Sequence, residues 1–161
     1  MNGGELVLSE IKQSDDLSRF CCGDADLDEF LKDEAMEYHR LCLAKTYLCR
    51  RGRDIVGFFS VAMDSIKEEK LEETFKIRNI PAFKIARLAV DVKYQKSGIG
   101  RILLTTILAE AQKMSEVIGC RLVTVDSKRE SIDFYIKHKF KHTHKSEKQV
   151  YPTLYLDLLR T

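Results

Sequence analysis

The feature that most restricts the fold of this chain is an apolar segment followed by a glycine-containing turn that opens directly into a helix. Residues 85–90 have the pattern of a buried strand, and the turn QKSGIGR follows at residues 95–101. Such a turn places backbone N–H groups without intrahelical partners at the positive end of a helix dipole, where a phosphate binds favourably. Its two glycines let the backbone approach a ligand closely, and Lys96 and Arg101 add positive charge. The stretch therefore predicts a phosphate-binding turn between a strand and a helix.

Comparison with known phosphate-binding motifs indicates which kind of turn this is. Neither the P-loop pattern G-x-x-x-x-G-K-[ST] nor the dinucleotide pattern G-x-G-x-x-G occurs in the chain. A glycine-rich connection without a ligand is the simpler alternative. The turn resembles the acyl-coenzyme A pyrophosphate loop Q/R-x-x-G-x-G/A of the GNAT superfamily of N-acetyltransferases, because Gln95, Gly98 and Gly100 occupy its three defining positions.

This resemblance covers nearly the whole chain and implies a fold, a cofactor and a set of contacts. The fold would be α/β (α+β), with a mixed, mostly antiparallel sheet, helices on both faces and a splayed central strand pair that receives acetyl-CoA. Coenzyme A would be the product, and no metal is needed. The residues that the resemblance assigns to cofactor binding are Leu88, Ala89, Val90, Gln95, Lys96, Ser97, Gly98, Ile99, Gly100, Arg101 and Ser131.

Length and composition suit one folded domain. The chain has 161 residues, of which 44% are hydrophobic and 32% charged, as in an ordinary globular protein. No apolar run approaches the roughly 20 residues of a membrane helix, and the N-terminus lacks the basic and apolar regions of a secretion signal. We therefore expect a single N-acetyltransferase domain over residues 1–161, in the cytoplasm and without a membrane partner. The net charge of +2 permits a nucleic-acid partner without demanding one.

Cysteine and histidine usage does not indicate a metal site. The five cysteines form an odd set without C-x-x-C spacing, so we expect reduced thiols, and no activating partner suggests a catalytic one. His138, His142 and His144 cluster near the predicted last hairpin, but their spacing matches no standard zinc site. A solvated basic face is the simpler interpretation.

Hydrophobic periodicity and turn residues predict the order of the elements. Asp24 is expected to cap the first helix, Gly119 to end the helix after the glycine turn, and Ser127 with Glu130 to form the capping box of a helix that reaches about His138. Strands are expected at residues 5–12, 46–50, 55–62, 85–90, 121–126 and 150–158, with an irregular charged loop over 64–82. The buried face of the helix after the glycine turn is expected to carry Ile99, Leu103, Ile107, Ala111, Met114 and Ile118. This order gives a mixed sheet with helices on both faces.

A tyrosine supplies the candidate acid. Acyl transfer from a thioester to an amine needs a neutral amine, a donor for the oxygen that becomes anionic, and an acid for the departing thiolate. The stretch FYIKHKF at residues 134–140 resembles the family motif F-Y-x-x-x-G-F, which places Tyr135 as the acid and a backbone N–H of residues 88–90 at the oxyanion. A phenol with a pKa of about 10 is protonated at neutral pH. A buried tyrosine that only forms a hydrogen bond is the alternative.

The turn after this helix departs from the family motif. Lys139 stands where the family has glycine, so we expect a different turn at this position.

A narrower resemblance lies near the N-terminus. Residues 20–31, FCCGDADLDEFL, look like the signature F-x-C-G-x-x-x-L-[ND]-x-[FY]-L of GNAT toxins from bacterial toxin–antitoxin pairs. The same subfamily is matched by Ile80-Pro81-Ala82, by Arg87-Leu88-Ala89-Val90-Asp91 and by Val125-Asp126 ahead of Phe134-Tyr135. The resemblance implies that the acceptor is the α-amino group of aminoacyl-tRNA. The resemblance also implies a ribbon–helix–helix antitoxin as partner, and a homodimer of this chain is compatible with the resemblance.

The chemistry of the acceptor agrees with this subfamily. An α-amino group with a pKa of about 8 is partly neutral at pH 7, whereas a lysine ε-amine with a pKa of about 10.4 asks for a strong base. No carboxylate of the sequence stands out as that base. A basic cluster would follow an RNA backbone, or else is an ordinary solvated surface. It includes the candidate substrate contacts Lys139 and Lys141, and its other members are Lys137, Lys145, Lys148, Arg50, Arg51 and Arg53. Arg87, the lone charge of an apolar strand, is either paired structurally or directed at the acceptor.

Two other functions are compatible with the sequence. A housekeeping acetyltransferase of a small amine or a protein N-terminus would use the same glycine turn and the same tyrosine. A module that holds acyl-coenzyme A as a sensor without turnover would not need Tyr135, and the presence of this residue argues against it. The acceptor class is therefore the question that the sequence leaves open.

Overall fold

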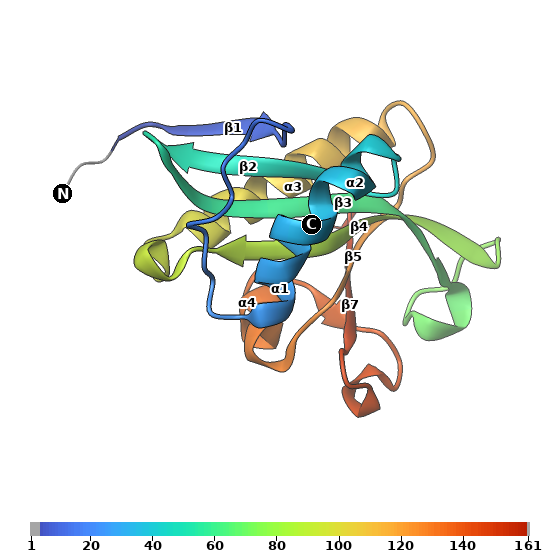
Figure 1. Cartoon of the computed structure of the whole chain (residues 1–161). Helices are drawn as coiled ribbons and strands as arrows, with labels where there is room; N and C mark the ends of the chain where they lie inside the picture. The colour runs from blue at the N-terminus through green and yellow to red at the C-terminus, as the bar shows by residue number, and fades with distance from the viewer. Residues whose placement is uncertain (1–3, 161) are drawn as a thin grey trace. The chain divides into compact units, whose positions relative to one another are not determined.

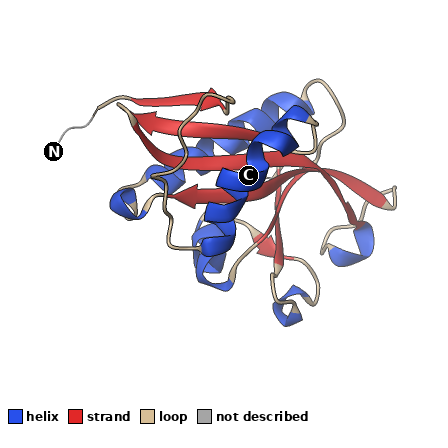
Figure 2. Cartoon of the chain, viewed as in Figure 1, coloured by secondary structure: helices blue, strands red, loops and turns tan. Residues whose placement is uncertain are grey.

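The helices and strands of the computed structural model, which describes residues 4–160, follow the predicted order (Figures 1 and 2). In chain order they are β1 (Leu6–Glu10), α1 (Ala25–Glu29), the π-helical η1 (Phe30–Glu34), α2 (Ala35–Arg40), β2 (Lys45–Arg51), β3 (Asp54–Lys67), η2 (Glu68–Lys70), β4 (Asn79–Val90), η3 (Val92–Tyr94), α3 (Ile99–Ser115), β5 (Leu122–Asp126), η4 (Arg129–Ser131), α4 (Ile132–Lys137), β6 (Lys141–His142), η5 (Ser146–Lys148) and β7 (Thr153–Asp157). Apart from η1, the short η segments are 3-10 helices.

The strands form a seven-stranded sheet in the order β1-β2-β3-β4-β5-β7-β6. The β4–β5 pair is parallel and its register runs from Ala82↔Leu122 to Ile85↔Val125. The pairs β1–β2, β2–β3, β5–β7 and β6–β7 are antiparallel. The predicted α/β fold with a mixed, mostly antiparallel sheet is thus confirmed.

The chain divides into two compact units. The first comprises the residues up to Ala62 together with Ala86–Thr106, and the second comprises Met63–Ile85 together with the residues from Ile107 onward. The strands β3 and β4 and the helix α3 contribute residues to both units. The expectation of a single domain over residues 1–161 stays a prediction.

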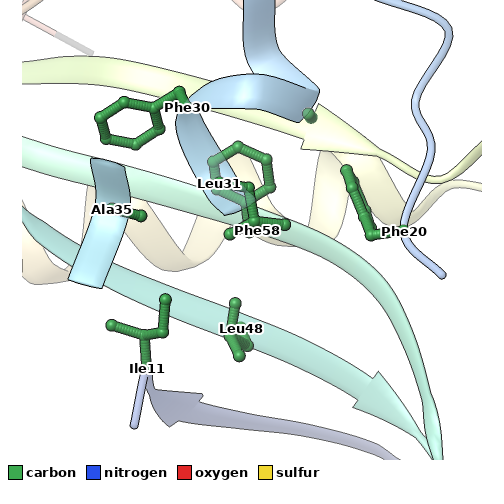
Figure 3. Packing of buried hydrophobic residues seen from close by; sticks show 8 residues of the cluster. Ile11, Phe20, Phe30, Leu31, Ala35, Leu48 and Phe58 are labelled. Atoms are coloured by element: carbon green, nitrogen blue, oxygen red, sulfur yellow. The ribbon is translucent and has the colours of Figure 1, made fainter. Parts of the chain in front are cut away.

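The core of the first unit lies between the continuous helical stretch α1–η1–α2 and the strands β2 and β3 (Figure 3). Its buried members are Ile11, Phe20, Phe30, Leu31, Ala35, Leu48, Phe58 and Ala89. The Phe58 ring lies edge-on to Phe20 at a centroid distance of 5.5 Å and stacks on Phe30 at 6.4 Å. Full burial of one phenylalanine contributes about 1.5–3 kcal/mol, so this aromatic group holds the helical stretch on the sheet.

The second unit has a core of its own, built from β4, β5, β7 and the end of β3. Its buried members are Ile66, Leu71, Ile80, Ala82, Leu122 and Tyr155, with Phe75 packed against them. At its edge the Arg121 guanidinium binds the Asp157 carboxylate through two hydrogen bonds of 2.7 and 3.0 Å. The same guanidinium lies 4.9 Å from the centroid of the Phe75 ring, so the loop before β4 is held against the sheet.

The helix predictions hold at their starts better than at their ends. Asp24 caps α1, because its carboxylate accepts the N–H groups of Asp26 and Leu27. The predicted face of α3 is buried from Ile99 to Ala111, but Met114 and Ile118 are exposed. The helix ends at Ser115, four residues before the predicted stop, and the apolar periodicity continues into the turn that follows.

The predicted loop over residues 64–82 is too long. β3 continues to Lys67 and β4 already begins at Asn79, so Pro81 lies within a strand. Exposed Met63 and Ser65 alternate with better covered neighbours, a strand pattern that the charged composition concealed. Pro81 has no N–H to donate, but its carbonyl accepts the Arg121 N–H at 2.9 Å, which keeps this end of β4 connected.

The predicted capping box is wrong. The Ser127 side chain is buried and its hydroxyl donates to the Lys128 carbonyl instead of capping a helix. The turn of η4 intervenes before α4 begins at Ile132, so the helix that carries Tyr135 is short.

Candidate active site

The glycine turn forms the predicted start of α3. The first backbone hydrogen bond of this helix runs from the Ile102 N–H to the Gly98 carbonyl at 3.1 Å, so the N–H groups just before Ile102 have no intrahelical acceptor. Lys96 and Gly98 have left-handed backbone angles, with φ of 63° and 88°. The turn therefore presents helix-terminal N–H groups directly after two left-handed residues, which is an arrangement suited to an anion.

A glycine in β3 lets this helix start lie close to the sheet. A Cβ added at Gly57 would lie 2.9 Å from the Ala89 carbonyl oxygen and 2.9 Å from Leu103 Cδ1. Neighbouring Phe58 faces the helical stretch α1–η1–α2, because successive residues of a strand point to opposite faces. In the first unit the sheet therefore has helices on both faces, as predicted. Sequence reasoning missed Gly57, although an isolated glycine in a strand pattern often marks a close backbone approach.

The Gln95 side chain points back toward the chain. Its Nε2 donates to the Val90 carbonyl at 2.9 Å and to the Cys22 carbonyl at 2.8 Å. Both amide hydrogens are therefore used within the first unit. Gln95 fastens the glycine turn to the end of β4 and to the segment before α1.

Buried Asp91 makes a second connection between the same segments. Its carboxylate accepts the Cys21 N–H at 3.1 Å and the Lys93 N–H at 2.9 Å. The Val92 N–H donates in return to the Cys21 carbonyl at 2.8 Å. Asp91 is only 4% exposed, so these hydrogen bonds satisfy a carboxylate that would be costly to bury alone. This residue was not among the predicted site residues.

The toxin-like signature is a hydrogen-bonded loop that leads into α1. Asp28 accepts the Cys22 N–H at 2.9 Å, and Gly23 has a φ of 90°, a left-handed angle that favours glycine. Asp24 then caps the helix. The polar positions of the signature thus shape this loop, while Phe20 and Leu31 belong to the core.

The structure gives Cys22 the properties of a structural thiol. Burial is the main cause that raises the pKa of this thiol, to about 12, so it stays protonated at neutral pH. Its sulfur donates weakly to the Asp24 carbonyl at 3.6 Å. A thiol in this state is a poor nucleophile.

Arg87 has a structural partner. Its guanidinium lies 4.4 Å from the centroid of the Phe30 ring, and it donates to the Ala86 carbonyl at 2.9 Å. Of the two alternatives for this residue, structural pairing is therefore observed. A contact between Arg87 and the acceptor stays a prediction.

Tyr135 is a buried side chain of α4. Its ring lies edge-on to Phe134 and Phe140, at centroid distances of 5.2 and 5.3 Å. Burial raises the pKa of its phenol above the usual value of about 10, so the proton stays on the oxygen.

The turn after α4 is formed by a lysine where glycine is usual. The Phe140 N–H donates to the Tyr135 carbonyl and the Lys139 N–H to the Ile136 carbonyl, both at 3.0 Å, which is a Schellman ending. Lys139 has a φ of 72°, the left-handed angle expected at this position. The expectation of a different turn is therefore wrong: the two hydrogen bonds hold the glycine-type geometry in spite of the side chain.

The remaining predicted site residues lie in the second unit. Ser131 stands at the start of α4 without a capping hydrogen bond from its side chain. Lys141 Nζ lies 3.6 Å from a Glu72 oxygen and 3.5 Å from a Glu73 oxygen, so its charge is largely compensated. The predicted cofactor residues 88–90 and 95–101 lie in the first unit, and Tyr135 and Lys139 lie in the second.

The three histidines near the C-terminus have separate hydrogen-bond partners. His138 Nδ1 pairs with the Phe134 carbonyl at 2.8 Å, His142 Nδ1 with the Ser146 hydroxyl at 2.9 Å, and His144 Nε2 with the Leu71 carbonyl at 3.1 Å. Among the described residues no group of three or more His, Cys, Asp or Glu side chains is placed to hold a metal ion.

Comparison with known proteins decides the family. A family model described as an acetyltransferase (GNAT) domain matches residues 38–142. This chain belongs to the GNAT acetyltransferases. A tRNA-acetylating toxin of Mycobacterium tuberculosis is 30% identical to this acetyltransferase over 136 residues, which cover 81% of each chain. A probable toxin TacT of Sinorhizobium fredii is 28% identical over 118 residues, 69% of this chain and 65% of that protein.

Solved structures share the fold of this GNAT acetyltransferase. A KacT variant superimposes with a TM-score of 0.88 at 20% identity, and covers 96% of this chain and 95% of its own. AtaT complexed with acetyl-methionyl-tRNAfMet gives a TM-score of 0.86 at 21% identity, with 95% of both chains covered. The predicted GNAT-like fold is confirmed. No helix in the part of the chain that the structure describes is long and apolar enough to span a membrane.

Proposed function

We propose that this acetyltransferase moves the acetyl group of acetyl-CoA onto the α-amino group of aminoacyl-tRNA, as the toxin of a toxin–antitoxin pair. The observation that carries the proposal is the connection between two motifs. Residues of the toxin-like signature, Cys21 and Cys22, are hydrogen-bonded to Asp91 and Gln95 at the cofactor turn. The same chain is 30% identical to a tRNA-acetylating toxin, and a structural neighbour holds acetyl-methionyl-tRNA.

The cofactor fits the glycine turn. The N–H groups at the start of α3 would receive the pyrophosphate, with Lys96 and Arg101 beside them. Bound acetyl-CoA supplies the activated thioester. Residues 88–90 end β4 just before this turn, so their backbone is the candidate donor to the oxygen that becomes anionic.

Tyr135 would hold a proton for the departing sulfur. Because burial raises its pKa, the phenol is fully protonated at neutral pH, but complete transfer to a thiolate with an ordinary pKa of about 8.5 is uphill. A thiolate in the same buried surroundings also has a raised pKa, which reduces that difference. A hydrogen bond from Tyr135 that becomes stronger as negative charge develops on sulfur is the role that suits this environment.

The acceptor amine needs little help from the protein. A useful fraction of α-amino groups with a pKa of about 8 is neutral at pH 7, so water suffices to receive the proton. Such a product would block translation, and we propose the cytoplasm as the location of the activity. The partner implied by this function is a ribbon–helix–helix antitoxin, and AtaT has been solved bound to the C-terminus of its antitoxin AtaR.

A competition among acceptors tests the proposal. Labelled acetyl-CoA is incubated with the protein and equal concentrations of charged tRNA, lysine-containing peptides and polyamines. We expect the label on the charged tRNA, and none after the amino acid has been stripped from it. Label only on peptides or polyamines would contradict the tRNA acceptor and support a housekeeping acetyltransferase.

A further inference from the structure

A cleft of about 510 Å³ lies in the second unit, between the loop that follows β5 and the loop that precedes β7. It is lined by Lys128, Arg129, Glu130, Lys148, Gln149, Val150 and Tyr151. The cleft therefore begins where η4 and α4 begin, and α4 carries Tyr135. Among the residues that line this cleft, Lys148 belongs to the predicted basic cluster, and the others were not among the predicted site residues.

Hydrogen bonds build the walls of the cleft. Arg129 donates to the Glu147 carbonyl at 3.1 Å and to the Gln149 carbonyl at 2.8 Å, which fixes one loop to the other. The Gln149 side chain accepts the Thr153 N–H at 3.2 Å, and the Thr153 hydroxyl donates to Asp126 at 2.7 Å. The loop before β7 is thereby anchored to both strands that end at the cleft.

The lining combines positive charge with an accessible aromatic ring. Three cations, Lys128, Arg129 and Lys148, face a single carboxylate, Glu130. Tyr151 is 49% exposed, and Lys128 Nζ lies 6.0 Å from the centroid of its ring. A cation beside an exposed ring is the combination with which proteins hold single-stranded nucleic acid, because bases stack on the ring and phosphates bind the cations.

The candidate contacts Lys139 and Lys141 offer less to a phosphate. They line a second and much smaller cavity of about 50 Å³ that also contains the carboxylates Glu73 and Asp157. Lys141 is ion-paired with Glu72 and Glu73, and Arg160 lies 3.9 Å from Glu73. Two carboxylates line that cavity beside its three cations, whereas one carboxylate lines the cleft beside three cations.

We propose that this cleft binds the single-stranded 3′ end of the RNA substrate, with a base stacked on Tyr151 and phosphates at Lys128 and Lys148. The inference rests on the proposed function, since it places the end of the RNA that carries the amino acid beside the helix of Tyr135. An open cleft suits a polymer that enters and continues beyond it.

Fluorescence anisotropy with a short single-stranded RNA oligomer tests the cleft without any turnover. Base stacking on a side chain is typically lost when the ring is removed, so Tyr151→Leu should weaken binding about tenfold, whereas Tyr151→Phe keeps the ring and should bind normally. Lys148→Gln should lower the slope of log affinity against log salt by about 0.7, the value for one phosphate contact with a single strand. Lys113→Gln, an exposed lysine of α3 outside the cleft, is the matched control and should change neither quantity.

Steady-state kinetics distinguishes whether the cleft binds RNA or the coenzyme. Tyr151→Leu should raise KM for charged tRNA and leave KM for acetyl-CoA unchanged. A rise only in KM for acetyl-CoA would assign the cleft to the adenine nucleotide of the coenzyme and overturn the inference, and so would equal RNA binding by the Leu and Phe variants. Ring-dependent RNA binding by a protein that acetylates no charged tRNA would support the cleft while refuting the proposed function.

Discussion

The Gln95 side chain donates a hydrogen bond of 2.8 Å to the carbonyl of Cys22, which lies 73 positions earlier in the chain. Gln95 belongs to the glycine turn and Cys22 to the signature before α1, so two motifs that are separate in the sequence are physically joined. Asp91 makes a second connection between the same segments, because its carboxylate accepts the Cys21 N–H. The toxin-like signature therefore acts in part as a support for the glycine turn.

Gln95→Leu should weaken cofactor binding by loosening this support. Two hydrogen bonds to carbonyls are lost, each with a net worth of about 0.5–1.5 kcal/mol, so KM for acetyl-CoA should rise roughly 5-fold to 150-fold if the full loss is felt in binding. A support also matters without ligand, so the ligand-free protein should unfold at a lower temperature. Gln112→Leu, at an exposed position of α3, is the control. A higher KM with unchanged ligand-free stability would instead make Gln95 a direct ligand.

Gly57→Ala should displace the start of α3. The new methyl group would meet the Ala89 carbonyl and Leu103 at 2.9 Å, and overpacking of this kind costs about 1–3 kcal/mol. Urea unfolding measures the loss. Gly119→Ala serves as the comparison, because its nearest neighbour, Pro81 Cγ, lies 3.9 Å away, and we expect a change within about 0.5 kcal/mol. Equal effects of the two substitutions would show that the close contact at Gly57 has no energetic cost.

Lys139→Gly should stabilise the protein. Lys139 has a left-handed φ of 72°, which costs a non-glycine residue free energy, so glycine should gain about 0.5–1 kcal/mol of unfolding free energy. Lys137→Gly, inside α4, should lose a similar amount because glycine is unfavourable within a helix. Thermal unfolding of both variants checks the opposite signs. If both substitutions destabilise the protein, the Lys139 side chain has a packing role that outweighs the strain of its backbone.

His39 should make stability fall at mildly acidic pH. Its Nδ1 accepts the Thr46 N–H at 2.9 Å, and burial, followed by the charge of Lys45, lowers its pKa. Because the unfolded chain then binds a proton more readily, this contribution is complete above a pH of about 6.5 and is lost as the pH falls toward the lower folded pKa. In His39→Gln, which does not titrate, the unfolding free energy should fall less between pH 7 and pH 5.5. An identical pH dependence in both proteins would exclude His39 as the cause.

The parts of the fold that sequence predicts well are those with a local cause. The Asp24 cap, the turn between β2 and β3 and the glycine turn before α3 follow from residues that are adjacent in the chain. The extension of β4 across Pro81 depends instead on pairing with a distant segment, which no local pattern reveals. The late end predicted for α3 has another cause, because the apolar periodicity continues beyond Ser115 into the turn.

Motifs single out candidate site residues, but they do not reveal the tertiary contacts that these residues make. Gln95 was identified by spacing, yet its two carbonyl partners come from β4 and from the segment before α1. Gly57 belongs to no motif, and Asp91 ends a subfamily motif that gives it no role, so only their buried surroundings show what they do. At Lys139 the motif misleads instead: the residue departs from the family glycine, yet its backbone has the left-handed angle that glycine would have.

The central claim is that Tyr135 serves acetyl transfer to the α-amine of charged tRNA, and one measurement tests it most directly. Wild type and Tyr135→Phe are incubated with labelled acetyl-CoA and charged tRNA, the amino acid is released by mild base, and the label on its α-nitrogen is followed with time. We predict labelled N-acetyl-amino acid from the wild type. The rate with Tyr135→Phe should be about 10²–10³ lower at unchanged acetyl-CoA affinity, because the donor to the charge that develops on sulfur has been removed. Absence of label on the α-nitrogen with wild type, or equal rates for both proteins, would contradict the account.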